Sequence, residues 1–581
     1  MPSILRPLPL AALLVASAAA RTLSAQLALG EPVACAGQIV SDIVVRAEPP
    51  GLGDLSRRGR IARSAARLVK AFHATTDPHV VKRLVIQHAG APCRELARAE
   101  SERLLRAQPY IAEAAIIPHA NADGTVTLEV VTVDELQWLA DVGVKATSPY
   151  VNRLRVGNMN IAGEALAAQG LWSKAMGPYR DTWGARVDDY QLLGRPYQLM
   201  LSGTRRPLGG EWTTLAAHAF LTDLQRVAWR AATGAREEYV PLLREGVDAP
   251  SMNVSRSFTD VGGIVRIGEP GRLSLFGASY TREYDAGGNT FVRVTRRGLF
   301  PDTARVTARD SVRPFRSARA NLLWGVRNIH FVRVTGFDAL TAAQDNPLGF
   351  QLGVLAGRSL AVLGSENDDI FVSADMYGGV GDETTLAAFQ VQGEGRQDYD
   401  DNRWDGIIGS GRAAFYQRLR PHHTLLLDAE WSGGWRQRLP FQVTLGDDPG
   451  GVRGYGASQA GGARRLVTRA EDRWYLGRFK ALADFGVAPF VDAGRLWAGD
   501  AAFGVDTKVK IGAGASLLVA VPPRSKRLFR LDVGYPLSAD PHAKLDIRIT
   551  VSDFTRTFWN EPRDVRRSRE STVPTSIFNW P

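Results

Sequence analysis

Residues 527–535 read Arg-Leu-Phe-Arg-Leu-Asp-Val-Gly-Tyr, and this stretch decides the fold. Its odd-numbered positions from 529 onward are apolar or aromatic, whereas its even-numbered positions include Arg530 and Asp532. Alternation with a period of two is typical of a β-strand whose two faces meet unlike surroundings. Because an unpaired charge in a dry core is very costly, the face with Arg530 and Asp532 needs water or charged partners.

The same alternation recurs in residues 425–432, where Asp428 and Glu430 share the polar face, and in residues 545–552. Between residues 136 and 554 no helical periodicity is sustained, and short alternating segments are separated by Gly, Asp, Asn and Pro clusters. This texture predicts one long β region. A soluble β-sandwich also alternates, with its polar face outward.

The N-terminus favours an exported protein and therefore a membrane barrel. Arg6 precedes an apolar run over residues 8–20 that ends in Ala-Ala-Ala, with Ala25 as a second cleavage candidate. This is the plan of a secretory signal, so residues 1–25 are predicted to be a signal peptide. A signal peptide, 58 glycines and a mean hydropathy of −0.14 together favour a transmembrane antiparallel β-barrel over residues 136–554. The roughly 420 residues accommodate sixteen strands, and fourteen or eighteen nearly as well.

Residues 36–135 have a different texture, which predicts a small α/β domain. Strands are expected near 39–47, 111–118 and 125–133, and helices over 56–73, 80–88 and about 97–105, the first being rich in arginine. Cys35 and Cys93 are the only cysteines of the chain. An oxidising compartment favours a disulfide between them, and two separate buried thiols are the alternative.

Composition excludes several classes of protein. No interior window holds 18 consecutive apolar residues, so helical membrane spans are not expected. The net charge of +11 is interspersed along the chain and calls for no nucleic-acid partner. We find no zinc-protease, serine-hydrolase or nucleotide-binding motif, so no enzymatic activity, metal or cofactor is predicted.

Five short motifs stand in an order that carries a family resemblance. The most specific is the loop sequence Asp447–Tyr455, which contains Val452, Arg453, Gly454 and Tyr455. The others are Asn160–Gly163, Glu471–Trp474, Phe490–Gly494 and Arg530–Leu537. Together they resemble the outer-membrane assembly and translocation superfamily, the bacterial surface antigen family of BamA, TamA and two-partner secretion transporters. Residues 36–135 resemble one POTRA domain, the periplasmic module of that family.

The resemblance implies a barrel of sixteen strands with the Val452–Tyr455 loop folded into its lumen. It also implies that Arg453 pairs with Glu471 and Asp492 on the barrel wall. Asp492 has the parity of Ala488 and Phe490, so it can face the lumen. An arginine fork can bind a carboxylate through two hydrogen bonds.

The implied function is insertion or translocation of proteins across the bacterial outer membrane. A client strand would pair with an exposed edge of the POTRA sheet and then with the barrel seam, between the first strand near 138–145 and the last strand. The expected partners are outer-membrane lipid, unfolded or secreted client proteins and periplasmic accessory subunits. A passive or substrate-specific channel and a structural outer-membrane protein are the alternatives.

The chain also departs from the family pattern. Family barrels usually end at their last strand, whereas here a tail of residues 555–581 follows. The last predicted strand, 543–554, contains no glycine that could act as a hinge, and Phe554 is out of phase with the apolar face. These departures argue against a barrel that opens freely between its first and last strands.

Overall fold

A computed structural model describes most of the chain. The described residues are 29–50, 73–144, 151–174, 181–244, 249–288, 290–295, 298–302, 314–399, 402–446, 450–456, 458–479, 482–540, 544–553 and 558–569. The predicted signal peptide, all but the last residue of the predicted helix 56–73, and Phe554 lie outside them.

The N-terminal domain, described over residues 29–50 and 73–134, is a four-stranded sheet with two helices. Its strands lie in the order β2-β1-β4-β3, with β1 and β4 parallel. The bounds are β1 Ala36–Glu48, α2 Pro78–Lys82, β2 Pro92–Arg94, α3 Glu95–Arg106, β3 Ile111–Ala120 and β4 Val126–Asp134. The predicted strands and the helix near 97–105 are confirmed, whereas the helix predicted at 80–88 is shortened to α2.

A disulfide and an apolar core hold this domain together. Cys35 and Cys93 form a disulfide with their Cα atoms 5.0 Å apart. Leu105 and Leu128 are fully buried in the core between α3 and the sheet. The alternative of two separate thiols is thereby excluded in the structure.

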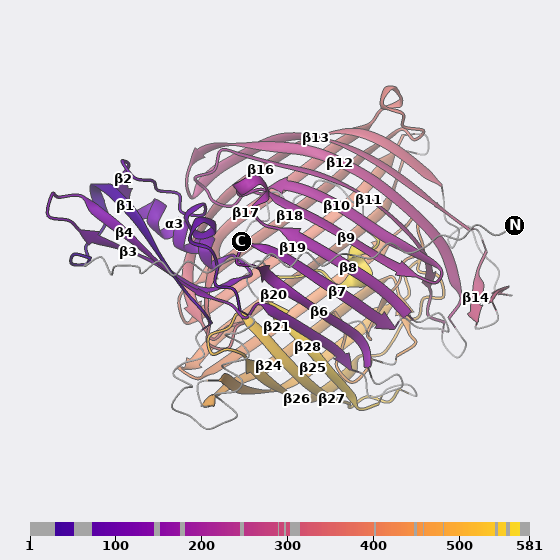
Figure 1. Cartoon of the computed structure of the whole chain (residues 1–581). Helices are drawn as coiled ribbons and strands as arrows, with labels where there is room; N and C mark the ends of the chain where they lie inside the picture. Colours follow the sequence, from indigo (N-terminus) through magenta and orange to yellow (C-terminus); the bar gives the residue numbers. More distant parts are fainter. Residues whose placement is uncertain are drawn as a thin grey trace, which may run out of the picture.

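The rest of the chain forms a closed antiparallel barrel (Figure 1). Its wall strands are β5 Trp138–Val144, β6 Val151–Ile161, β7 Leu166–Lys174, β8 Asp181–Asp189, β9 Gln198–Arg206, β10 Gly209–His218, β11 Val227–Pro241, β12 Ser251–Glu269, β13 Arg272–Gly287, β16 Phe315–Thr335, β17 Ala343–Ser359, β18 Asp369–Gly381, β19 Thr385–Asp398, β20 Arg403–Arg420, β21 His423–Trp435, β24 Arg464–Phe479, β25 Ala483–Trp497, β26 Lys510–Ala520, β27 Arg527–Pro536 and β28 Asp546–Asp553. Smaller elements in the connections are η2 Leu192–Gly194, β14 Val292–Thr295, β15 Gly298–Pro301, η3 Ala361–Leu363, β22 Val443–Thr444, β23 Gly461–Gly462 and, after β28, α4 Arg563–Arg566.

The wall contains twenty strands, so the prediction of sixteen was wrong. Most connections between wall strands are shorter than the roughly fifteen residues that sixteen strands leave for each. Connections 207–208, 270–271 and 421–422 contain two residues each. Since the strand number is even, the chain leaves β28 at the end of the barrel where the N-terminal domain lies.

Alternation along the strands is as predicted. On β27, Val533 and Tyr535 face outward with 39% and 60% of their surface exposed, whereas Arg530 and Asp532 face the lumen. On β21, Leu427 faces outward. Outward-facing side chains in the middle of the wall are mostly apolar, and the charged side chains of the inner face form ion pairs with one another. No helix among the described residues is long and apolar enough to cross a membrane.

An arginine substitution on the outer face tests whether the apolar side chains in the middle of the wall contact lipid. Leu322 lies within β16 and is 73% exposed. We expect Leu322→Arg to lower the free energy of unfolding in lipid by about 2–4 kcal/mol, because a charge near the bilayer midplane is poorly solvated. Urea unfolding in liposomes measures this change.

Val362→Arg is the matched control, since Val362 is 88% exposed in the connection between β17 and β18. It should change the free energy of unfolding by less than about 0.5 kcal/mol. Equal small effects of the two substitutions would show that the outer face does not contact lipid.

Candidate functional site

The most specific motif of the sequence, Val452–Tyr455, lies inside the barrel. Residues 450–456, here called the inserted loop, belong to the connection between β21 and β24, with the β22–β23 pair at its base. Val452 and Tyr455 are completely buried. Asp447–Pro449 lie outside the described residues. The motif therefore points into the lumen, where the resemblance placed it.

Arg453 joins the inserted loop to the wall. Its Nε and Nη2 atoms donate to the two carboxylate oxygens of Asp492 on β25, each at 2.7 Å, and its backbone N–H donates to the same carboxylate at 3.1 Å. Its Nη1 atom is 3.3 Å from Glu471 on β24. The guanidinium also lies over the Phe490 ring, 3.3 Å from its centre. The structure thus brings Arg453 to both acids that the sequence singled out.

Neighbouring charges balance this site. Asp532 on β27 is a third acid, 3.4 Å from Arg453. Glu471 also pairs with Arg530 and Arg473, each at 2.6 Å. Three arginines therefore face three acids, so no charge of this cluster is buried alone. Buried pairs of this kind fix a geometry more than they add stability.

Glycines on three wall strands make room for the inserted loop. A Cβ atom on Gly512 of β26 would lie 2.0 Å from the carbonyl oxygen of Arg453, and one on Gly494 of β25 would lie 2.6 Å from Val452 Cγ2. A Cβ atom on Gly534 of β27 would lie 3.0 Å from the backbone N of Gly454. Gly454 itself has a φ of +98°, which favours glycine. The close approach of loop and wall depends on these absent side chains.

The inserted loop also contacts the last strand. The N–H of Gly454 donates to Asp546 at 3.3 Å, and Arg548 donates to the carbonyl oxygen of Val452 at 3.3 Å. Both side chains belong to β28, which lies beside β5 and closes the barrel. The loop is therefore attached to the strand that forms the seam.

Sequence reasoning missed several of these contributors, among them two acids and two glycines. Asp532 and Asp546 lie on the predicted polar faces of their strands, so parity could have proposed both as partners of the loop. Gly512 and Gly534 carry no such signal, because most of the 58 glycines lie elsewhere. Only the position of the loop reveals why these two must be glycine.

The motif Asn160–Gly163 has a separate role, which the sequence did not reveal. It forms the turn between β6 and β7, and it contacts the N-terminal domain. The Asn160 amide donates to Thr76 Oγ1 at 2.8 Å, and the N–H of Asp77 donates to the Gly163 carbonyl at 3.0 Å. A Cβ atom on Gly163 would lie 2.3 Å from the carbonyl oxygen of Thr75. The turn is thus a docking point between domain and barrel.

A second docking point lies at the turn between β26 and β27. Lys526 Nζ donates to the carbonyl oxygen of Ile111 at 3.0 Å, and Arg527 donates to that of Pro109 at 3.3 Å. Glu135 accepts from Ser525 Oγ at 2.8 Å and from the N–H of Lys526 at 3.0 Å. Complete burial raises the pKa of the Glu135 carboxyl. Arg106 adds an ion pair to Asp345 on β17 at 2.7 Å.

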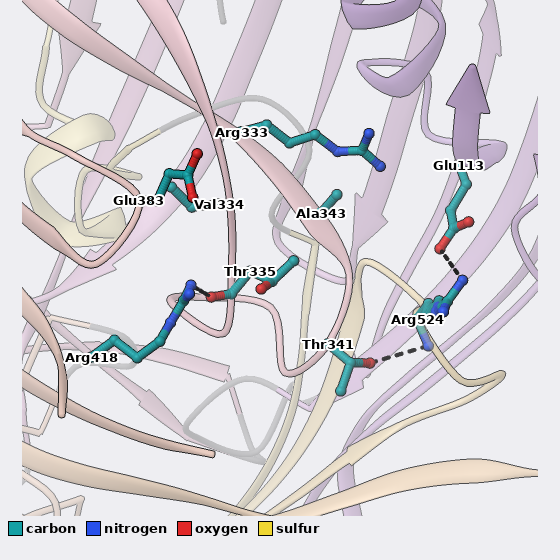
Figure 2. Close-up of a pocket in the computed structure, with 9 residues that line it drawn as sticks. All are labelled: Glu113, Arg333, Val334, Thr335, Thr341, Ala343, Glu383, Arg418 and Arg524. Carbon is teal, nitrogen blue, oxygen red and sulfur yellow. Dashed lines mark hydrogen bonds and ion pairs between the residues drawn. The ribbon is translucent and has the colours of Figure 1, made fainter. Parts of the chain in front are cut away.

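A pocket of about 410 Å³ opens beside this junction (Figure 2). Arg524 links its walls: its side chain is 3.4 Å from Glu113 on β3, and its backbone N–H donates to Thr341 at 3.2 Å. Arg333 and Arg418 line the pocket from the barrel side. In Figure 2 the three guanidinium groups point in different directions and do not meet at one point. The pocket is therefore a gap between domain and barrel with no convergent set of donors.

One edge of the domain sheet is already occupied. On β3, the carbonyl oxygens of Ala114 and Ile116 accept from Arg106 and Arg98 of α3, and the N–H of Ile116 donates to Glu102. Further along β3, residues 31–33 pair with 118–120. Most of this edge over residues 114–120 is therefore already hydrogen-bonded within the chain. The outer edge of β1 beyond Val40 has no strand paired to it among the described residues.

Replacement of Arg453 tests the anchoring of the loop. We expect Arg453→Ala to lower the free energy of unfolding by about 3–5 kcal/mol, because the carboxylates of Asp492 and Glu471 lose a buried partner. Heat-dependent mobility of the folded barrel in gels measures the loss. Lys508→Ala, in the exposed connection between β25 and β26, is the control and should behave as the unmodified protein.

Gly512→Ala tests the close approach of loop and wall while every charge is kept. The added methyl group cannot fit beside the carbonyl oxygen of Arg453, so the inserted loop must move away from β26. We expect faster protease cleavage within residues 436–463. Gly170→Ala is the matched control, since a Cβ atom on Gly170 of β7 meets nothing within 4 Å. Unchanged cleavage in Gly512→Ala would contradict the loop position.

Comparisons with known proteins come from structures alone. No protein-family model and no curated protein matches the sequence. BamA from Haemophilus ducreyi lacking POTRA domains 1–3 is 13% identical, covers 89% of this chain and 84% of its own, and has a TM-score of 0.35. CdiB from Escherichia coli is 12% identical, with 91% and 93% covered and a TM-score of 0.40. CdiB from Acinetobacter baumannii is 10% identical, with 89% and 73% covered and a TM-score of 0.37.

BamA, which belongs to the family that the motifs resemble, is thus one of the solved structures to which this chain is similar. Identities of 10–13% and TM-scores of 0.35–0.40 carry no argument about function. Function has to be argued from the side chains of this chain.

Proposed function

We propose that the protein is a bacterial outer-membrane barrel that inserts other proteins into that membrane or translocates them across it. In this proposal residues 36–135 are a POTRA domain in the periplasm. The partners are outer-membrane lipid, unfolded or secreted client proteins, and periplasmic accessory subunits. The protein has no enzymatic activity, uses no cofactor and binds no nucleic acid.

The observation that carries the proposal is the attachment of the inserted loop to the strands next to the seam. Arg453 binds acids on β24, β25 and β27, while Gly454 and Val452 bind β28. A loop held by consecutive strands up to the seam can fix the position of the last strand. A simple pore has no need for such an attachment.

The dimensions of the seam support the same proposal. The two strands that meet there, β5 and β28, have seven and eight residues and are the shortest of the wall. Fewer residues make fewer ladder hydrogen bonds, so this junction costs the least to open. An opened seam exposes two strand edges, each of which can template a client strand.

The N-terminal domain supplies the first docking edge in this proposal. Since β3 is covered by α3 side chains and residues 31–33, the client has to pair with the outer edge of β1. Backbone hydrogen bonds to an edge strand tolerate many client sequences. The domain is tied to the barrel at two turns, so a client on β1 is held near the barrel mouth.

A passive channel is the second candidate, and the contents of the lumen favour the first. The discriminating feature of a channel is a loop that narrows the lumen without pairing Arg453 to the wall. Arg453 is paired, and residues 558–569 occupy the lumen as well. The third candidate, a structural protein, has no use for a tightly docked periplasmic domain.

Depletion of the protein followed by quantitative proteomics of the outer membrane tests the function. We expect the abundance of barrel proteins or secreted proteins of the host to decline, since these proteins are no longer inserted or translocated. Complementation with the unmodified gene restores them and serves as the control. If every outer-membrane and secreted protein keeps its abundance, insertion and translocation are both excluded.

A photo-crosslinking side chain at Arg46 tests the docking edge separately. Arg46 is an exposed residue of β1, and we expect it to capture nascent client proteins. The same group at Asp123, in the exposed turn between β3 and β4, is the control. Equal capture at both positions would contradict docking on β1.

A further inference from the structure

The tail of the chain turns back into the barrel. After β28, residues 558–569, here called the tail segment, lie in the lumen, and they include α4, which appears in yellow inside the barrel (Figure 1). Phe558 packs against Tyr377 of β18 with ring centres 5.6 Å apart. Arg412 of β20 donates to the Phe558 carbonyl at 2.9 Å, and Trp559 donates to Glu430 of β21 at 3.2 Å. The tail segment therefore enters along one wall.

Its middle meets the inserted loop. Val565 is completely buried in one cluster with Val452 and Tyr455. Asp564 accepts two hydrogen bonds from Arg465 of β24, at 2.6 and 3.1 Å. The tail segment and the inserted loop thus form one body at the centre of the lumen.

Its end reaches the opposite wall. Arg236 of β11 and Arg256 of β12 donate to the carbonyl oxygen of Arg567 at 2.8 and 3.1 Å, and Arg256 also donates to that of Arg569 at 3.1 Å. Carbonyl groups at a helix C-terminus lack partners within the helix, so cations are favoured there. On the shorter way round the wall, seven strands separate β12 from β24. The tail segment therefore bridges the lumen from side to side.

The contacts are those of a ligand in a polar site. Arg569 donates to Ser410 of β20 at 2.7 Å and is 3.3 Å from Glu394 of β19, and it also binds Glu561 of its own segment at 2.7 Å. Apart from Val565, Phe558 and Trp559, the interface consists mainly of ion pairs and hydrogen bonds. Charged side chains that lose such a partner in a lumen can be rehydrated, so the wall stays stable when the segment leaves. Arg453 differs, because its acids are buried beneath the loop.

We propose that the barrel lumen is a peptide-binding site and that the tail segment is its resident ligand, a plug that leaves when the pore opens. The site selects a short peptide with an aromatic pair, an aspartate and flanking arginines. This proposal does not depend on the proposed function, since a plug closes a channel as well as a translocation pore.

Deletion of residues 558–581 tests the plug in planar bilayers. We expect the single-channel conductance of the shortened protein to rise several-fold over that of the full chain. A synthetic peptide with the sequence of residues 558–569, added to the bath, should lower it again. A scrambled peptide of the same composition should leave the conductance unchanged. The natural peptide carrying Arg566→Ala should lower the conductance as much as the unmodified peptide does. Arg566 is exposed on α4, and its side chain forms no hydrogen bond or ion pair with the described residues, which makes it the matched control.

A charge exchange tests the site itself. Arg465→Asp in the shortened barrel should weaken the block by the natural peptide, and the peptide with Asp564→Arg should restore it. In case the shortened protein does not fold, Asp564→Arg and Arg465→Asp in the full chain should each raise the conductance, and the double variant should lower it.

Three results would overturn the proposal. They are an unchanged conductance after a deletion that leaves the barrel folded, an equal block by the scrambled peptide, and charge variants of the full chain that conduct as the unmodified protein does. The proteomic readout of the proposed function is independent of all three, so failure of one proposal leaves the other standing.

Discussion

A wall of twenty strands encloses more space than its own inward side chains can fill. Water could occupy that space, but the chain fills much of it with its own segments. The inserted loop occupies the side formed by β24 to β28, and the tail segment bridges to β11 and β12. Arg453 is the contact on which this arrangement depends, because it fixes the loop against which Val565 of the tail segment packs.

The wall is adapted to that contact in two ways. Acids stand on the inner face of β24, β25 and β27, where the guanidinium of Arg453 meets them, and glycines stand where a side chain would collide with the inserted loop. The acids bind and orient the guanidinium, and the glycines let the loop backbone approach the wall closely. Neither works without the other, since a fork held 2 Å further out would lose its two short hydrogen bonds to Asp492.

Period-two alternation predicted the long β region and the inward direction of Asp492, because parity along a strand is a local property of the sequence. The choice of a barrel over a soluble sandwich needed the signal peptide, the glycine content and the hydropathy as well. The partners Glu471 and Asp492 came from the family resemblance, and the structure brings both to Arg453. The strand number could not be predicted, since it depends on connection lengths that alternation does not reveal. The tail segment was equally hidden: Arg567 and Arg569 resemble any solvated basic tail until the wall around them is known.

Strand β27 shows how the parts of the molecule are connected. Arg527, at its first position, binds the N-terminal domain through the carbonyl oxygen of Pro109, and Asp532, five residues later, binds Arg453. At about 3.3 Å per residue, these contacts are roughly 17 Å apart along one rigid strand. A force on the N-terminal domain would therefore act on the strand that holds the inserted loop, and the loop in turn contacts β28 at the seam. The N-terminal domain, the lumen and the seam share one continuous hydrogen-bonded path, which a barrel with a freely hanging domain would lack.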